Sequence, residues 1–174
     1  MKKYLSMMAM ALMLSTSFTA CDVETNEEAG GTNIEKMCGY WDVTYDAVND
    51  AGEVVYEDPY GVGVATVYTY NTASNSLTQM WLDDRNTFWA YKFLVDINYD
   101  ARTFSAGSRD YDADGTGQAI VTEGKILENA AKNLHGAPCD SIVFYISFSD
   151  DEDGAAYGWT KWRVSGTRHT GFTE

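Results

Sequence analysis

The chain has 174 residues and a formal charge of −14, with 26 Asp and Glu against 12 Lys and Arg. Such an acidic chain is a poor partner for nucleic acid or for anionic lipid head groups, because both are bound through clusters of Lys and Arg. Aromatic residues make up 14% of the sequence and only 2 residues are proline, a composition that is typical of an all-β domain.

The chain begins MKKYLSMMAMALMLSTSFTAC. Lys2 and Lys3 precede an uncharged stretch that is too short to span a membrane and that ends in small residues before Cys21. This arrangement resembles the signal peptide and lipobox of bacterial lipoproteins. The resemblance implies that residues 1–20 are removed and that Cys21 carries the lipid. An ordinary secretory signal that contains a cysteine is the alternative.

Residues 21–35 carry acids and glycines and few bulky apolar groups. Such a segment buries too little surface to offset the entropy of ordering it, so we expect a flexible acidic tether. Residues 36–174 then form one domain of ordinary size.

Beyond the tether, segments rich in aromatic and β-branched residues alternate with turn signals. The expected strands are residues 38–48, 61–70, 76–82, 87–99, 102–106, 118–127, 141–148 and 155–165. We also expect a short ribbon at 53–57, a helical turn around 129–134 and a bulge or kink at Gly124. Eight strands without a βαβ rhythm predict an all-β, eight-stranded antiparallel up-and-down barrel, with a β-sandwich as the alternative.

Several expected strands place apolar and aromatic side chains on one face. The candidate ligand-binding residues, which share these inward faces, are Trp41, Val43, Tyr45, Trp89, Tyr91, Phe93, Val95, Phe144 and Ile146. An eight-stranded barrel is just wide enough for side chains or for one small ligand. The pattern therefore predicts either an aromatic ligand cavity or a filled core.

The tripeptide Gly39-Tyr40-Trp41 opens the first expected strand. Gly-x-Trp at this position resembles the lipocalin and calycin signature. The resemblance implies that Trp41 plugs the closed end of the barrel and that a basic residue from the end of the last strand packs over it. Arg163 and Arg168 are the candidates, and Arg168 is preferred because it follows that strand. The barrel-closing set is thus Gly39, Trp41 and Arg168.

Three more segments point to a narrower family. Gly124-Lys125-Ile126, Asp140-Ser141-Ile142-Val143-Phe144 and Ser165-Gly166-Thr167-Arg168-His169-Thr170-Gly171-Phe172 resemble the lipid-binding putative hydrolase family, lipocalin-like lipoproteins of Bacteroidetes. The resemblance covers about residues 36–174. It implies a lipoprotein at the outer membrane or cell surface, anchored through acyl chains on Cys21, that binds a lipid or other small hydrophobic ligand inside the barrel.

Two other functions stay open. One is a cell-surface module with a filled barrel that binds protein or glycan through exposed aromatic residues such as Tyr60, Trp81 and Tyr111. The other is a hydrolase, for which the sequence offers little support. His135 and His169 are the only histidines, and no Gly-x-Ser-x-Gly elbow occurs. We therefore expect no catalytic residues and no cofactor.

A metal and a disulfide were the remaining candidates. Asp110, Asp112 and Asp114 alternate as in the first half of a calcium loop, but Val121 stands where the loop needs a bidentate Glu. We expect an incidental acidic loop and no metal. A disulfide between Cys38 and Cys139 is allowed outside the cytoplasm. In the expected barrel, however, the last strand lies between them, which favours two free thiols.

Overall fold

The computed structural model of the chain describes residues 31–112, 114–133 and 135–171. The expected signal peptide, Cys21 and most of the expected tether lie outside these residues. Thr32–Glu174 forms one compact unit. Within the described part, no helix combines the length and the apolarity needed to cross a membrane.

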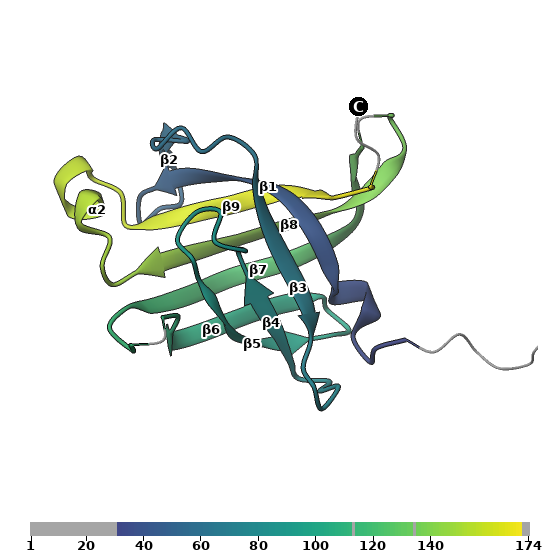
Figure 1. The fold of residues 1–174 in the computed structure, drawn as a ribbon. Coiled ribbons are helices and arrows are strands. Elements are labelled where there is room, and N and C mark those ends of the chain that lie inside the picture. Colours follow the sequence, from purple (N-terminus) through teal and green to yellow (C-terminus); the bar gives the residue numbers. More distant parts are fainter. Residues whose placement is uncertain (1–30, 113, 134, 172–174) are drawn as a thin grey trace, which may run out of the picture. The chain divides into compact units, whose positions relative to one another are not determined.

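The described residues form strands with very little helix. In chain order the elements are η1 (Glu35–Met37), β1 (Gly39–Val48), β2 (Val54–Glu57), β3 (Ala65–Asn71), β4 (Gln79–Asp83), β5 (Lys92–Asn98), β6 (Thr103–Asp110), β7 (Gln118–Lys132), β8 (Pro138–Phe148), α2 (Glu152–Tyr157) and β9 (Lys161–Arg168). The strands pair antiparallel in the order β2-β1-β3-β4-β5-β6-β7-β8-β9, and β1 also pairs with β9. That last pairing closes the sheet (Figure 1). The fold is therefore an all-β closed barrel of eight antiparallel strands plus one extra strand, as predicted, and not a sandwich.

The closing seam between β1 and β9 depends on a close backbone approach. Gly166 of β9 lies opposite Val43 of β1. A Cβ atom at position 166 would overlap the carbonyl oxygen of Asp42. Only glycine fits there without moving the backbone, so Gly166 lets the two strands meet and complete the barrel.

The expected strand at residues 87–99 is shorter in the structure, because β5 begins only at Lys92. Ala90 has a φ of 58°, a left-handed conformation that interrupts a strand. The residues after β4 form a loop instead. Trp89 lies in this loop, and its side chain packs against the core as those of Tyr91 and Phe93 do. The inward-facing alternation that predicted a strand therefore continues through a loop.

The helical turn expected around residues 129–134 was wrong. Residues 129–132 belong to β7, which ends at Lys132. The end of β7 pairs with β8 through Ala131 opposite Cys139. Sheet pairing supplies the backbone hydrogen bonds here, so tertiary context overrides the local preference. The expected irregularity at Gly124 is confirmed, because the β7–β8 register shifts between Thr122 and Lys125.

The last strand also begins later than expected. Residues 155–157 belong to α2 rather than to a strand. Asp151 caps the start of α2 by accepting a hydrogen bond from the Gly154 amide at 3.1 Å. Gly158, with a φ of 91°, ends it in the left-handed conformation that glycine favours. An Asp cap and a Gly stop are a recognisable signal, but the apolar residues after Gly154 were interpreted as strand.

The inward side chains form one core. Its largest fully buried members are Trp41, Trp162, Tyr45, Tyr91, Phe144, Ile34, Met37, Met80, Leu82, Ile142, Ile146 and Val43. Ile34 lies within the segment expected to be tether, so packing begins two residues before the expected domain boundary at residue 36. The core thus runs from the N-terminal turn to the last strand.

Candidate functional site

The barrel has two ends, and we name each after the residue that covers it. At the Trp41 end, β1 begins, β9 finishes and η1 lies alongside β3. At the Phe88 end, β4, β6 and β8 finish, and β5, β7 and β9 begin. In Figure 1 the Phe88 end is the side that carries α2 and β2. The two ends are closed in different ways.

The Trp41 end is closed by a chain of buried hydrogen bonds. Trp41 is fully buried, and its indole Nε1 donates to Thr69 Oγ1 at 2.9 Å. The Thr69 hydroxyl donates in turn to the carbonyl of Met37 in η1 at 2.6 Å. Ile34 and Met37, both fully buried, complete the cover. The Trp41 indole N–H and the Thr69 hydroxyl are thus both buried with a hydrogen-bond partner, as a stable closure requires.

Arg168 lies over the outer face of the Trp41 ring. Its guanidinium carbon is 4.5 Å from the ring centroid, a cation–π distance. Nη1 donates to the Cys38 carbonyl at 2.6 Å and Nη2 pairs with Asp140 at 3.1 Å. A Cβ atom at Gly39 would lie 2.7 Å from Arg168 Nη1 and 2.9 Å from the Trp41 ring. Gly39 therefore leaves the space that the guanidinium occupies.

At the Phe88 end, the cover is a side chain from the loop between β4 and β5. Phe88 stacks on Tyr45 with ring centroids 3.9 Å apart, and it meets Trp162 edge-on at 4.8 Å. Tyr45 and Trp162 are fully buried members of the barrel interior, whereas Phe88 is only partly buried. Phe88 therefore works as a plug that the loop inserts between strand residues.

One buried carboxylate organises this loop. Asp84 has no solvent exposure. Its Oδ2 accepts hydrogen bonds from the amides of Phe88, Trp89 and Ala90 at 3.2, 2.8 and 2.9 Å, and Oδ1 accepts one from Asn86 at 2.9 Å. Burial raises the pKa of Asp84 above its ordinary value, and the amide donors offset only part of that shift. The backbone of the loop that carries the plug is thus organised around the Asp84 carboxylate.

Trp89, next to the plug, is held by a surface network. Its ring stacks on Phe148 with centroids 4.7 Å apart. Its Nε1 donates to the Tyr111 hydroxyl at 3.1 Å and to Asp150 at 3.2 Å. Tyr111 donates to Asp150 at 2.6 Å, and burial together with that carboxylate raises the pKa of Tyr111 to about 12. These contacts fasten the loop to the residues around β6 and β8.

A second carboxylate joins two tryptophans at the same end. Oδ2 of Asp151 accepts hydrogen bonds from the indole of Trp159 at 3.0 Å and from that of Trp162 at 2.9 Å. Because Asp151 also caps α2, it couples the helix to the barrel interior. The Phe88 end therefore combines a dense set of aromatic rings with carboxylates that orient them.

Directly beneath the plug lies a pair of buried phenols. The hydroxyls of Tyr45 and Tyr91 are 2.9 Å apart, and both residues are at most 1% exposed. Burial raises the pKa of each, so both keep their protons. Within such a pair one hydroxyl donates and the other accepts, and the accepting hydroxyl keeps an O–H of its own. The pair gives the apolar interior a polar contact point.

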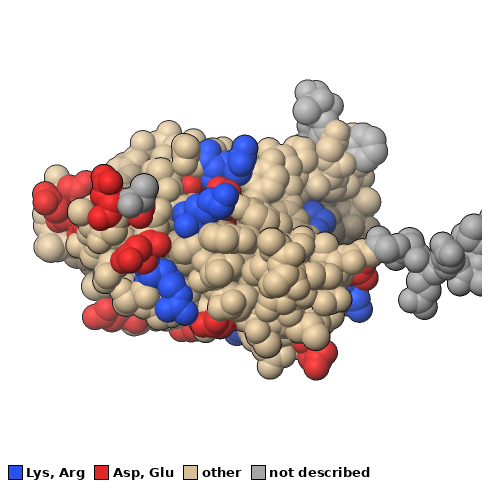
Figure 2. Space-filling model, turned by 60° about the horizontal axis from the view of Figure 1, so that its bottom comes forward, with Lys and Arg blue, Asp and Glu red and all other residues tan. Residues whose placement is uncertain are grey.

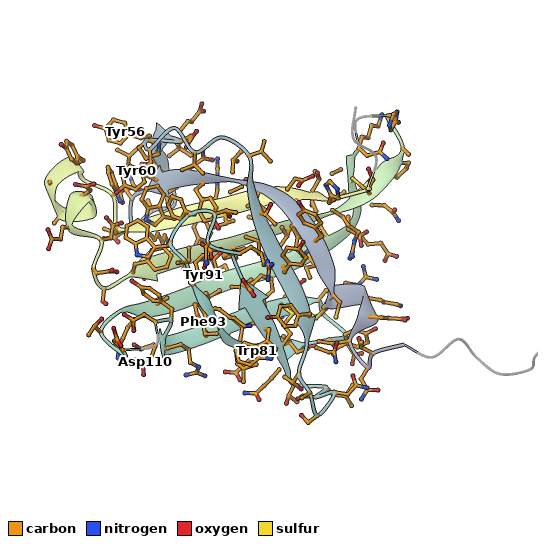
Figure 3. All side chains as sticks on the ribbon, viewed as in Figure 1. Tyr56, Tyr60, Trp81, Tyr91, Phe93 and Asp110 are labelled. Carbon is orange, nitrogen blue, oxygen red and sulfur yellow. The ribbon has the colours of Figure 1, made fainter. Side chains whose placement is uncertain are left out.

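The residues predicted to bind ligand divide into two groups. All of them except Trp89 are buried core residues. They lie on β1, β5 and β8, apart from Tyr91, which lies just before β5. Figure 3 labels Tyr91 and Phe93 among them. In this structure these side chains fill the interior: Tyr45 contacts Tyr91, and Phe144 lies 5.5 Å from Phe104. Trp89 lies in the loop. Asp84 and Phe88 were not predicted, because Asp84 falls in the break between the expected strands at 76–82 and 87–99, and Phe88 falls within the second of these strands, outside its inward-facing set.

Aromatic residues expected on exposed loops are distributed differently. Tyr60 is exposed in the loop after β2, and Tyr111 is partly buried beside Phe148. Trp81 lies on β4 rather than on a loop, with its ring stacked near Tyr70 and with Lys92 5.5 Å from its centroid.

His169 lies on the outer surface of the barrel. Its Nδ1 is 2.8 Å from the Asp42 carboxylate, and its ring stacks on Tyr40 at 4.2 Å. An Asp–His pair is part of a hydrolytic triad, but a nucleophile must also reach the histidine. No serine, threonine or cysteine side chain of the described residues forms a hydrogen bond with His169.

The acidic loop and the cysteines have their own arrangements. Asp112 accepts hydrogen bonds from the Thr116 amide and hydroxyl and from the Gly117 amide. Over residues 31–112, 114–133 and 135–171, no group of three or more His, Cys, Asp or Glu residues is arranged to hold a metal ion.

Cys38 and Cys139 are free thiols. Cys38 directly precedes β1 and Cys139 lies in β8. β9 lies between these two strands and keeps the thiols apart.

Fold and ends together define a closed antiparallel β-barrel with a plugged mouth, consistent with a lipocalin-like barrel. The chain belongs to the family described as lipid-binding putative hydrolase, whose family model matches residues 26–173. The family predicted from the sequence is thus confirmed, and its name fits lipid binding. No curated protein matches the chain.

Proposed function

We propose that this chain is a lipid-anchored lipoprotein whose barrel takes up a lipid or other small hydrophobic molecule through the Phe88 end. One observation carries the proposal: the plug of the barrel belongs to a loop, and it is only partly buried although it stacks on the interior residue Tyr45. Movement of residues 84–90 would open the interior without breaking any strand pairing.

The surface uncovered by Phe88 suits an apolar molecule with one polar group. An entering ligand would meet the ring of Tyr45 and the edge of Trp162 in place of the plug. Deeper in, the Tyr45–Tyr91 hydroxyl pair offers a hydrogen bond. Asp150, which accepts a hydrogen bond from the Trp89 indole beside the plug, disfavours an anionic head group at the entrance, so the proposed ligand is neutral.

The anchor rests on the sequence and the family. The resemblance of the N-terminal segment to a lipobox supports acyl chains on Cys21, and the net charge of −14 disfavours electrostatic binding to anionic lipids as an alternative anchor. The acidic residues after Cys21 resemble a surface-export signal of Bacteroidetes lipoproteins, which supports a location at the outer membrane or cell surface. The residues between Cys21 and Ile34, where the packed core begins, would separate the barrel from the bilayer.

Ligand uptake is tested by loosening the plug. Phe88→Ala, in the otherwise unchanged chain, should strengthen binding of the neutral probe N-phenyl-1-naphthylamine, measured by its fluorescence. Tyr70→Ala, a partly buried tyrosine on the outer face of β3, is the matched control and should leave binding unchanged. Native mass spectrometry of the purified chain should also detect a co-purifying neutral lipid. No probe binding to either the wild-type chain or Phe88→Ala, both folded, would refute uptake.

Anchoring is tested separately through Cys21. In cells supplied with labelled palmitate, the wild-type chain should carry the label and fractionate with membranes. Cys21→Ser should lose both properties, whereas Cys38→Ser should keep them. Labelling of Cys21→Ser equal to that of the wild type would refute acylation at this residue.

A second function is favoured by the packed interior. If the barrel stays filled, the exposed tyrosines at the Phe88 end, among them Tyr56 and Tyr60, would serve a cell-surface module that binds protein or glycan. The probe experiment decides between the two functions, because a permanently filled barrel would not respond to Phe88→Ala.

A further inference from the structure

A pocket of about 390 Å³ lies outside the barrel interior, at the Phe88 end. Its lining comes from β2, from the loop that follows β2, and from the segment around α2: Tyr56, Pro59, Tyr60, Asp153, Tyr157 and Trp159. Tyr56 and Tyr60 lie close together on this side of the molecule in Figure 3. Four of the six lining residues are aromatic, and none is basic.

Two of the pocket's rings are nearly perpendicular to Trp159, and a third is nearly parallel to it. Tyr56 meets Trp159 at an interplanar angle of 80° and Tyr60 meets it at 78°, with centroids 5.9 and 6.4 Å apart. Tyr157 is nearly parallel to Trp159, at 11° and 5.7 Å. The rings of Tyr56, Tyr60 and Tyr157 thus line the pocket in two orientations, as the walls of an aromatic cage around a cation do. A flat neutral ring would stack on only one of these orientations.

The exposure of these rings leaves room for a ligand. Tyr56 is 47% exposed, Tyr60 42% and Tyr157 60%, whereas Trp159 is only 4% exposed. Trp159 is fixed from below by its hydrogen bond to Asp151. The cage therefore has a rigid floor and walls that are open to solvent.

The charge of the pocket has one sign. The Tyr60 hydroxyl donates to Asp153 Oδ2 at 2.9 Å, which holds that carboxylate at the pocket. Asp153 ends a run of four acids from Asp150, and Figure 2 shows acidic side chains gathered at this end of the molecule. A cation gains from this field and an anion is repelled.

We propose that this pocket binds a small alkylated ammonium ion of the choline type. The aromatic faces take its methyl groups and its charge, and Asp153 supplies the counter-charge. The ligand is the free cation and not a phosphocholine head group, because a phosphate beside the ammonium would face Asp150–Asp153. Tyr60 also stacks near the plug residue Phe88, with centroids 6.1 Å apart, so the pocket borders the barrel mouth. The proposed cation nevertheless binds outside the barrel and does not rest on uptake through it.

The test compares choline with its neutral isostere 3,3-dimethyl-1-butanol on the full chain, by NMR or tryptophan fluorescence. Choline should bind roughly tenfold more tightly than the isostere, which has the same shape without the charge. Asp153→Asn, which can still accept the hydrogen bond from Tyr60, should weaken choline several-fold and leave the isostere unchanged. Tyr157→Leu should weaken choline as well. Asp50→Asn and Tyr70→Leu, which lie outside the pocket, should change neither.

Three results would overturn the proposal. Equal affinities for choline and the isostere would make the pocket merely apolar. Tighter binding of phosphocholine than of choline would assign it to a lipid head group. Absence of choline binding to the wild-type chain, with an unchanged melting curve, would remove the site altogether. None of these results bears on the barrel, because Phe88→Ala is read out with a different, neutral probe.

Discussion

The two ends of the barrel are closed by the same kinds of side chain, which are placed differently at each end. Both have an aromatic ring in contact with the interior and a charged group that holds the cover. At the Trp41 end the ring belongs to a strand and is fully buried, and Arg168 lies outside it. At the Phe88 end the ring belongs to a loop and is partly buried, and the charged group, Asp84, lies inside. The first closure is part of the sheet, and the second is attached to it.

This difference separates stability from access. A cover built into a strand cannot move without breaking sheet pairing, so the Trp41 end belongs to the cooperative core. A cover on a loop can move while every strand stays paired. Substitutions at the Trp41 end should therefore lower global stability, whereas substitutions at the Phe88 end should affect mainly the loop.

The largest expected effect is that of Trp41→Ala. It removes a fully buried ring and leaves the Thr69 hydroxyl and Arg168 without their shared partner. We expect a loss of about 3–5 kcal/mol in the free energy of unfolding, measured in urea. Trp89→Ala is the matched control from the other end and should lose about 1 kcal/mol, since Trp89 is only partly buried. Equal losses would abolish the distinction between the ends.

Gly39→Ala should come next. The added Cβ would lie 2.7 Å from Arg168 Nη1 and 2.9 Å from the Trp41 ring. Either the guanidinium or the indole must shift, and we expect a loss of about 2 kcal/mol in the free energy of unfolding. Gly107→Ala is the control, because a Cβ there meets nothing within 4 Å. If Gly39→Ala were as stable as Gly107→Ala, the close packing of Arg168 on Trp41 would be refuted.

Much of the Trp41 end was predictable, because Gly39, Trp41 and Arg168 lie in or beside regular strands and match a known signature. Period-two alternation predicted most of the strands, and the count of eight without a βαβ rhythm favoured the barrel over the sandwich. The Phe88 end was not predictable in the same way. Asp84 looks like an ordinary turn residue, and only the fold reveals that four amides converge on it. The strand expected from residue 87 failed because alternation alone does not distinguish an inward-facing loop from a strand.

Asp84→Asn tests the hub of the loop. Asparagine offers one acceptor oxygen, which at the Oδ2 position still accepts from the amides of Phe88, Trp89 and Ala90. Its amide N–H groups then face the Asn86 amide, which loses its acceptor. We expect a loss limited to about 1.5 kcal/mol, because a buried charge is removed as well. Hydrogen exchange should accelerate at residues 86–90 and stay unchanged in β1 and β9. Uniform acceleration across the barrel would show that the loop is part of the cooperative core.

The smallest expected effect is a dependence on pH that only the Phe88 end possesses. Burial holds the pKa of Asp84 above its ordinary value, so between that value and the raised one the folded chain binds more protons than the unfolded chain. The stability that Asp84 contributes is therefore fully present below the ordinary pKa of about 3.9 and is lost as the pH rises through the raised pKa.

The difference in unfolding free energy between wild type and Asp84→Asn isolates this contribution, because the other carboxyl groups are common to both chains. Urea unfolding of the two chains between about pH 3.5 and pH 7 should give a difference that shrinks as the pH rises. The same difference for Trp41→Ala should stay constant, since that substitution removes no titrating group. A difference for Asp84→Asn that stays flat would mean that the amide donors balance burial, and one that grows with pH would mean that they outweigh it. The loop would then be held by an ordinary ionised turn residue, and the two ends would differ in position alone.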